Sequence, residues 1–234
     1  MIHVEDQEGY RTVTLDRPER ANAVTPSALA ALAEAVVDAT QPVVYLRGAG
    51  EAFCAGADRS VVAEIAAEGA AVEPFVRAGQ RVATVLEESS AVVVAGVDGA
   101  ARGGGVELAV ACDLRVATPR ATFAEPGVTF GLFGAWGGTV RLPEVVGLGD
   151  AMDLSLSGRV IAAEEARRIG LVSRVLKEPR SVAEAVADND SAALSHLKER
   201  LRDRGSTPEQ EAADVEAFAS LVERHAQSLR ELDG

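Results

Sequence analysis

The stretch Val92–Val97 contains no polar side chain, and this continuity constrains the fold more than any other feature of the chain. In a sheet with one wet face, apolar and polar side chains alternate along each strand. An unbroken apolar strand therefore predicts a sheet that is covered on both faces. The stretch Val43–Arg47 is predicted to form a second buried strand. Helical patterns separate and follow these strands, so we expect an α/β fold.

The expected elements alternate through the first part of the chain and become mostly helical after residue 137. Thr25 and Pro26 supply an N-cap and a first-turn proline, so a helix is expected from there to Ala39. The other expected elements are strands over 13–15, 114–117 and 122–124, and helices over 73–88, 103–112, 181–204 and 207–232. We therefore predict an α/β core over residues 1–180 and a C-terminal helical region over 181–234.

The charge of the chain narrows the classes of partner. Its 36 Asp and Glu residues outnumber its 23 Lys and Arg residues, for a formal net charge of −13. Nucleic acids and anionic membranes are usually bound by a basic face, so we expect no nucleic-acid partner and no membrane partner. The N-terminus lacks the basic start and apolar run of a secretory signal, and a cytoplasmic location is expected.

Cysteine and histidine residues predict neither a disulfide nor a metal site. Cys54 and Cys112 are the only cysteines, and their small or apolar neighbours favour buried free thiols. The three histidines lie far apart in the sequence, without metal-ligand spacing. We therefore expect no metal and no redox cofactor.

The glycine run Gly103–Gly105 lies between a predicted strand and a predicted helix. Free N–H groups and the helix dipole favour negative charge at the start of a helix, so the N–H of Gly104 is a candidate oxyanion donor. Glu107 follows about one helical turn later and is expected to point toward the same place as a catalytic acid or base. The alternative is a tight turn followed by a solvated glutamate.

The segment Phe53–Asp58 is a second corner of small residues before a predicted helix. The N–H of Ala57 is the candidate for the other oxyanion donor, and one such donor contributes about 3 kcal/mol of transition-state stabilisation. Asp58 is expected to cap the helix that it opens. Two N–H donors and one carboxylate are enough to stabilise and protonate an enolate, so these residues indicate an acyl-thioester enzyme.

Four motifs, in order along the chain, resemble those of the enoyl-CoA hydratase/isomerase, or crotonase, superfamily. The matching segments are Arg17–Ala23, Phe53–Asp58, Val97–Ala109 and Ser157–Val172. The resemblance implies a crotonase-like spiral core of repeated ββα units with a C-terminal helical extension. It also implies a homotrimer or a dimer of trimers, whose C-terminal helices help to cover the active site. Its substrate would be a bent acyl-CoA, with coenzyme A as part of the substrate and no other cofactor.

The resemblance also implies roles for individual positions. Ala57 and Gly104 match the two N–H groups that hold the thioester oxygen. Arg20 and Ala21 match the segment that contacts the adenine and phosphates of CoA. The stretch that lines the pantetheine and the thioester matches residues Ala55, Gly56, Asp58, Arg59 and Ser60.

Two departures from the family pattern affect the predicted reaction. Hydratases of this family hold and activate water with two glutamates; Glu107 matches the first, and Gly127 stands where the second is expected. Glu125 lies on the same face of an extended segment, roughly 7 Å away, and is either a displaced acid or a satisfied polar group. Trp136 lies close to the acyl pocket in this alignment, either as core packing or as a wall that shapes the substrate.

These residues leave three functions open. The first is hydration of a 2-enoyl-CoA, or the reverse dehydration, with Glu107 as the principal acid/base. The second is isomerisation, or C–C bond cleavage or formation, on the same enolate in the space opened by Gly127. The third is a catalytically weak acyl-CoA-binding homologue, suggested by the missing second glutamate.

Overall fold

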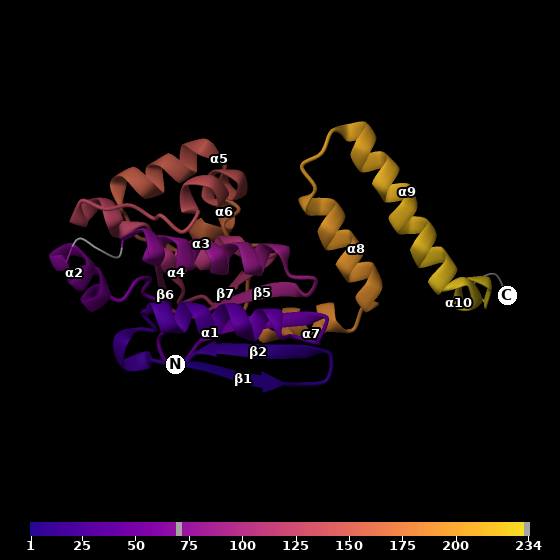
Figure 1. Cartoon of the computed structure of the whole chain (residues 1–234), viewed down its shortest axis with the longest axis horizontal. Coiled ribbons are helices and arrows are strands. Elements are labelled where there is room, and N and C mark those ends of the chain that lie inside the picture. The colour runs from indigo at the N-terminus through magenta and orange to yellow at the C-terminus, as the bar shows by residue number, and fades with distance from the viewer. Residues whose placement is uncertain (69–71, 232–234) are drawn as a thin grey trace.

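The computed structural model of the chain describes residues 1–68 and 72–231 (Figure 1). The last three residues of the predicted region 181–234 therefore lie outside the described residues. The strands are β1 (Ile2–Asp6), β2 (Tyr10–Leu15), β3 (Val43–Gly48), β4 (Ala52–Cys54), β5 (Val92–Val97), β6 (Ala100–Arg102), β7 (Leu114–Ala117), β8 (Thr122–Ala124), β9 (Ile161–Ala162) and β10 (Arg174–Val175). The helices are η1 (Pro18–Arg20), α1 (Pro26–Val37), α2 (Arg59–Glu68), α3 (Val72–Glu88), α4 (Gly104–Ala111), η2 (Pro126–Phe130), α5 (Gly138–Ser157), α6 (Ala163–Arg168), α7 (Arg180–Ala187), α8 (Ser191–Arg202), α9 (Thr207–Arg224) and α10 (Ala226–Glu231).

The chain follows one repeated path, in which a strand of a large sheet, a strand of a small sheet and a helix come in turn. Strands β3, β5 and β7 are parallel neighbours in the six-stranded sheet β1-β2-β3-β5-β7-β10. Strands β4, β6 and β8 are parallel neighbours in the four-stranded sheet β4-β6-β8-β9. The predicted spiral of ββα units is therefore confirmed. Because β4, β6 and β8 run in the same direction, the corners that follow them meet at one edge of the small sheet.

The large sheet is covered on both faces, as the apolar stretch Val92–Val97 predicts. All six residues of β5 are buried. Val93, Ala95 and Val97 belong to the main core with residues of α1, α3 and α4. Val92 and Val94 belong to a second cluster with residues of α7. The alternation of side chains along a strand thus divides one apolar run between two hydrophobic layers.

Local signals explain several helix starts. Thr25 caps α1 by accepting a hydrogen bond from the N–H of Ala28, as expected from its position before Pro26. The prediction of one helix over 181–204 is wrong, because the chain leaves α7 after Ala187 and Asp190 caps a new helix, α8, through the N–H of Ala193. The helix expected over 207–232 is likewise divided at His225 into α9 and α10, and residue 232 lies outside the described residues.

The C-terminal helices differ in what they contact. Helix α7 packs on the large sheet through Val182 and Ala183. Helices α8 and α9, orange to yellow in Figure 1, lie at one side of the molecule, and α8 contacts β5 of the large sheet. Several of their apolar side chains are exposed, among them Leu201 and Phe218. Of the helices that the structure describes, none has the length and apolar character needed to span a membrane.

Candidate active site

The corners after β4 and β6 lie against each other. Ala52 and Cys54 pair in parallel with Ala100 and Ala101, so the two chains leave the small sheet side by side. Gly56 has a φ of +83°, and a Cβ there would lie 2.9 Å from the nitrogen of Gly104. Only glycine permits both this backbone angle and this approach. The fold therefore brings Ala57 and Gly104 to neighbouring positions, as the sequence predicts.

Both candidate oxyanion donors are available to a ligand. Gly104 is the first residue of α4, where N–H groups have no partner within the helix. Ala57 is held in place by its neighbours, because the N–H of Val24 binds the carbonyl of Gly56 and the N–H of Asp58 binds the carbonyl of Val24. Within the described part of the chain, neither the N–H of Ala57 nor that of Gly104 has a hydrogen-bond acceptor.

Glu107 is buried in α4, with 3% of its surface exposed, which contradicts the alternative of a solvated glutamate. Its Oε1 accepts hydrogen bonds from the backbone N–H groups of Trp136 at 2.7 Å and Gly138 at 2.8 Å. Burial raises the pKa of the Glu107 carboxyl, while the two N–H donors and the charge of Arg141 act in the opposite direction. Since both bonds fall on Oε1, Oε2 is left without a partner among the described residues and can hold a water molecule or a substrate proton.

Glu125 is a second buried carboxyl at the site, 7% exposed, and its Oε1 has no hydrogen-bond partner among the described residues. It follows β8, and the N–H of Gly103 binds the carbonyl of the preceding residue, Ala124. Glu125 therefore lies beside the start of α4. Burial, and then the charge of Glu107, raise the pKa of Glu125 to about 8. No described residue therefore satisfies this oxygen.

Gly127 offers no carboxylate, and its surroundings restrict larger side chains. It lies in η2, where a Cβ would be 3.0 Å from the carbonyl oxygen of Leu132 and 3.0 Å from Cα of Phe133. Glu125, two residues earlier, is thus the carboxyl that this segment supplies.

A glycine-rich segment encloses the Glu107 carboxylate. A Cβ at Gly134 would lie 2.9 Å from Cδ of Glu107, and one at Gly138 would lie 2.8 Å from its Oε1. Glycine at both positions allows the backbone to approach closely enough to donate its N–H groups. The sequence analysis did not assign these two glycines to the site, although their spacing in Gly134–Gly138 is a readable signal of close backbone approach.

Trp136 is buried in this segment, with 4% of its surface exposed. Its indole meets the ring of Phe75 edge-on, with the ring centroids 5.6 Å apart. Side chains at Gly79 or Gly104 would overlap the indole. Of the two alternatives that the sequence offered, the contacts of the indole support core packing, and they also place the ring against Gly104 of the site.

The residues expected to contact CoA lie on η1, on the corner after β4 and at the start of α2. Arg20 is exposed at the end of η1. Ala21 has a φ of +50°, and its carbonyl accepts the N–H of Ala55. Arg59 opens α2 and lies over the ring of Phe130 at 4.9 Å. The hydrogen bond between Ala21 and Ala55 thus joins two segments that are distant in the sequence, close to the corner that presents Ala57.

Asp58 has a structural role that the sequence predicts in part. Its Oδ1 accepts the N–H of Ser60 at 2.9 Å and its hydroxyl at 2.7 Å, which caps α2. Its Oδ2 pairs with Arg17, which the sequence analysis did not assign to the site. These hydrogen bonds, with those from Ser60 first, lower the pKa of Asp58 to about 2. The carboxylate therefore fixes the corner that presents Ala57.

A buried amide, also missed by the sequence analysis, supports the same corner. Asn22 has a left-handed φ of +58° and is completely buried. Its Nδ2 donates to the carbonyls of Ala49 at 2.9 Å and Ala52 at 2.7 Å, and its Oδ1 accepts the N–H of Arg17. An asparagine within an otherwise small-residue turn was the available signal, because asparagine tolerates this backbone region.

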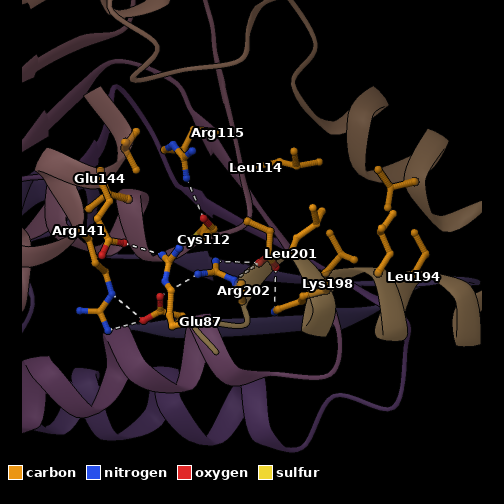
Figure 2. A pocket seen from close by; sticks show the side chains of 17 residues that line it. Glu87, Cys112, Leu114, Arg115, Arg141, Glu144, Leu194, Lys198, Leu201 and Arg202 are labelled. Carbon is orange, nitrogen blue, oxygen red and sulfur yellow. Dashed lines mark hydrogen bonds and ion pairs between the residues drawn. The ribbon is translucent and has the colours of Figure 1, made fainter. Parts of the chain in front are cut away.

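A separate pocket, between α8 and the core, is lined by charged side chains that pair with one another (Figure 2). Asp113 contacts Lys198 and Arg202 at 2.8 Å each, and Glu87 pairs with Arg202 and Arg141. Asp113 also accepts the N–H of Val93 at 2.7 Å, so it ties the start of β7 to β5. Within residues 1–68 and 72–231, no group of three or more His, Cys, Asp or Glu side chains is placed to hold a metal ion.

The spiral of ββα units and a buried glutamate beside two backbone donors place the protein in the crotonase superfamily. The family model described as Enoyl-CoA hydratase/isomerase matches residues 5–231. A crotonyl-CoA hydratase from Syntrophomonas wolfei is 34% identical over 229 residues, which cover 93% of this chain and 87% of that protein. A short-chain-enoyl-CoA hydratase from Clostridium acetobutylicum is 34% identical over 212 residues, covering 86% and 80%.

Solved structures show the same relationship. An enoyl-CoA hydratase from Bacillus anthracis superposes with a TM-score of 0.90 and 28% identity, covering 99% of this chain and 95% of that one. An enoyl-CoA hydratase from Thermoplasma volcanium gives a TM-score of 0.89 and 28% identity, covering 99% and 96%. The chain belongs to the enoyl-CoA hydratase/isomerase family and is an enzyme of that family.

Proposed function

We propose that the protein adds water to the double bond of a 2-enoyl-CoA, and catalyses the reverse dehydration. The observation that carries this proposal is the buried Glu107 carboxylate, whose Oε1 is fixed by two N–H groups beside the free N–H of Gly104. In this arrangement a proton acceptor lies close to a site for a developing enolate oxygen. Such prepositioned donors stabilise charge as it forms in the transition state. The names of the relatives above support the same reaction.

The proposed reaction uses each group once. The N–H groups of Ala57 and Gly104 bind the thioester oxygen. Glu107 removes a proton from a bound water as the water oxygen bonds to Cβ of the substrate, and the electrons of the double bond move into the enolate. Glu125 gives a proton to Cα, which restores the thioester carbonyl. Water is thereby added, and transfer of the acquired proton from Glu107 to Glu125 resets the site.

The different surroundings of the two carboxyls support these roles. Glu107 is held by two N–H donors, which favour its ionised form. Glu125 has an unpartnered buried oxygen, and the charge of Glu107 also favours its protonated form, with a pKa of about 8. Environments that push two pKa values apart assign the base and the acid. The N–H donors accordingly suit Glu107 to the role of base, and the unpartnered buried oxygen suits Glu125 to that of proton donor.

Glu107→Gln tests the proposal. The amide oxygen can still accept the N–H groups of Trp136 and Gly138, but the side chain cannot take a proton. Turnover of crotonyl-CoA should fall by about 100- to 10,000-fold, while calorimetry shows unchanged binding of butyryl-CoA. Glu88→Gln, at an exposed position of α3, is the matched control and should keep full activity. Unchanged turnover of Glu107→Gln would rule out this role for Glu107.

Isomerisation of the double bond is the second candidate, and the glycine at position 127 favours it. Isomerisation transfers a proton between two carbons of the acyl group and uses no water. It therefore does not need a second carboxylate at position 127 to hold a water molecule. Mass spectrometry of the product separates the two reactions, because hydration adds the mass of one water and isomerisation adds none. A product of unchanged mass would show that the enzyme is an isomerase and not a hydratase.

We also propose that the enzyme acts as a homotrimer or a dimer of trimers in the cytoplasm, with the CoA of its substrate as the only cofactor. Exposed apolar residues on α5, α8 and α9 support assembly, since large exposed apolar areas mark interaction sites. They include Leu148, Met152, Leu156, Leu197, Leu201 and Phe218. Light scattering coupled to size-exclusion chromatography gives the mass in solution, and a monomer would contradict the assembly.

A further inference from the structure

The Trp136 indole fills the space between α3 and the start of α4. A side chain at Gly79 of α3 or at Gly104 of α4 would overlap the ring, so these two glycines and the tryptophan are complementary. The edge-on contact with Phe75 closes a further side of the ring. Only 4% of the Trp136 surface is exposed. The indole is therefore a packed, rigid part of the site.

The backbone of this residue is also fixed. The N–H of Trp136 donates to Oε1 of Glu107 at 2.7 Å. The carbonyl of the preceding residue, Ala135, accepts a hydrogen bond at 3.0 Å from Nε2 of Gln80, in α3. The backbone that carries the ring is therefore tied to both α3 and the catalytic carboxylate.

These contacts place the indole beside both groups that define the substrate position. The backbone N–H of Trp136 holds the proposed base, and the indole ring lies on Gly104, whose N–H is a proposed thioester donor. In the proposed reaction, the reacting carbons of the bound thioester lie between those two groups. Acyl carbons beyond them would then meet a wall of aromatic carbon instead of open space.

We propose that Trp136 is a specificity-determining residue that limits the acyl group to short chains of crotonyl or butyryl length. The inference rests on the proposed acyl-CoA function, and it names the substrate class of the same site. A longer acyl chain could bind only if the indole left its place against Gly79 and Gly104.

Binding of saturated CoA esters tests this inference without requiring turnover. Trp136 is the only tryptophan of the chain, so the tryptophan emission of the intact protein reports on this residue alone. Butyryl-CoA should change the emission more than free CoA does. By calorimetry, octanoyl-CoA should bind at least about ten-fold more weakly than butyryl-CoA. The weaker binding is expected because the additional methylenes cannot be buried.

The variant Trp136→Ala should reverse this preference and bind octanoyl-CoA more tightly than butyryl-CoA. Burial of one methylene strengthens binding about four-fold, so octanoyl-CoA should bind the variant at least about ten-fold more tightly than butyryl-CoA. Trp136→Phe keeps a ring at the wall and should retain the preference for butyryl-CoA. Phe133→Ala removes an exposed ring of the same segment, 74% exposed, and should leave the preference unchanged.

The possible outcomes separate the inference from the proposed function. If the wild type binds octanoyl-CoA as tightly as butyryl-CoA, or if bound butyryl-CoA leaves the emission of Trp136 unchanged, the role of Trp136 is wrong while acyl-CoA binding stands. If no CoA ester binds, the proposed function itself fails. Because the wild-type measurements and Trp136→Phe already decide between these results, the test does not depend on the folding of Trp136→Ala.

Discussion

Glu125 should make the stability of the protein depend on pH in a way that one substitution removes. Its pKa, ordinarily 4.5, is raised to about 8 by burial and by the charge of Glu107. The folded protein thus holds this proton more tightly than the unfolded chain does. The contribution to stability is fully present below pH 4.5, and it is lost as the pH rises through about 8.

The size of this effect follows from the two pKa values. One pH unit corresponds to about 1.4 kcal/mol for a group that is protonated in only one of the two states. Between the ordinary pKa of 4.5 and the folded value of about 8, the loss in the free energy of unfolding is at most about 5 kcal/mol. Glu125 is 7% exposed, so solvent screens this cost little. The neutral amide in Glu125→Gln has no proton to lose.

Urea unfolding at a series of pH values between about 5 and 9, followed by circular dichroism, measures the effect. The difference between the wild type and Glu125→Gln cancels the other titrating groups. The variant should equal the wild type near pH 5 and exceed it by several kcal/mol near pH 9. Glu88→Gln, at an exposed position, should track the wild type throughout.

A second variant checks the cause of the raised pKa. In Glu107→Gln the neighbouring charge is absent, so the fall in stability should still begin near pH 4.5 but should end at a lower pH than in the wild type. A difference between wild type and Glu125→Gln that stays constant with pH would refute the reasoning, because the Glu125 carboxyl would then ionise alike in the folded and unfolded chains.

Three further predictions concern packing around the site and the cysteine thiols. Lys198→Met removes a 2.8 Å donor from Asp113 and from the carbonyl of Ala91, while Asp113 keeps its ion pair with Arg202, so the urea-unfolding free energy should fall by about 1–3 kcal/mol. The other lysine, Lys177, is exposed, and its replacement by Met should change the unfolding free energy by less than about 0.5 kcal/mol. Gly104→Ala places a methyl group against the Trp136 indole and should cost about 1–3 kcal/mol in the same assay, whereas Gly149→Ala, in open space, should be neutral or stabilising. Burial raises the pKa of Cys54 and of Cys112 to about 12, so Ellman's reagent should label neither thiol in the native protein and both in urea; rapid native labelling would contradict their burial.

Much of the architecture could be predicted because its signals are local. The apolar run Val92–Val97 requires cover on both faces whatever the rest of the chain does. Gly103–Gly105 and Gly56 indicate tight turns of the backbone. Thr25 with Pro26 marks the start of a helix. The break between α7 and α8 was missed because Asp190 is both an acceptable helix residue and a strong N-cap, and tertiary packing of α7 on the sheet selects the cap.

The sequence by itself determined the family, the two corners that present Ala57 and Gly104, and the glutamate that follows them, because these depend on residue types at fixed spacings. Only the tertiary structure decided the environment of each group. Contacts between segments distant in the chain bury Oε1 of Glu125 without a hydrogen-bond partner among the described residues. Contacts of the same kind place Trp136 on Gly79. Desolvation and close packing depend on all surrounding atoms, so no local pattern records them.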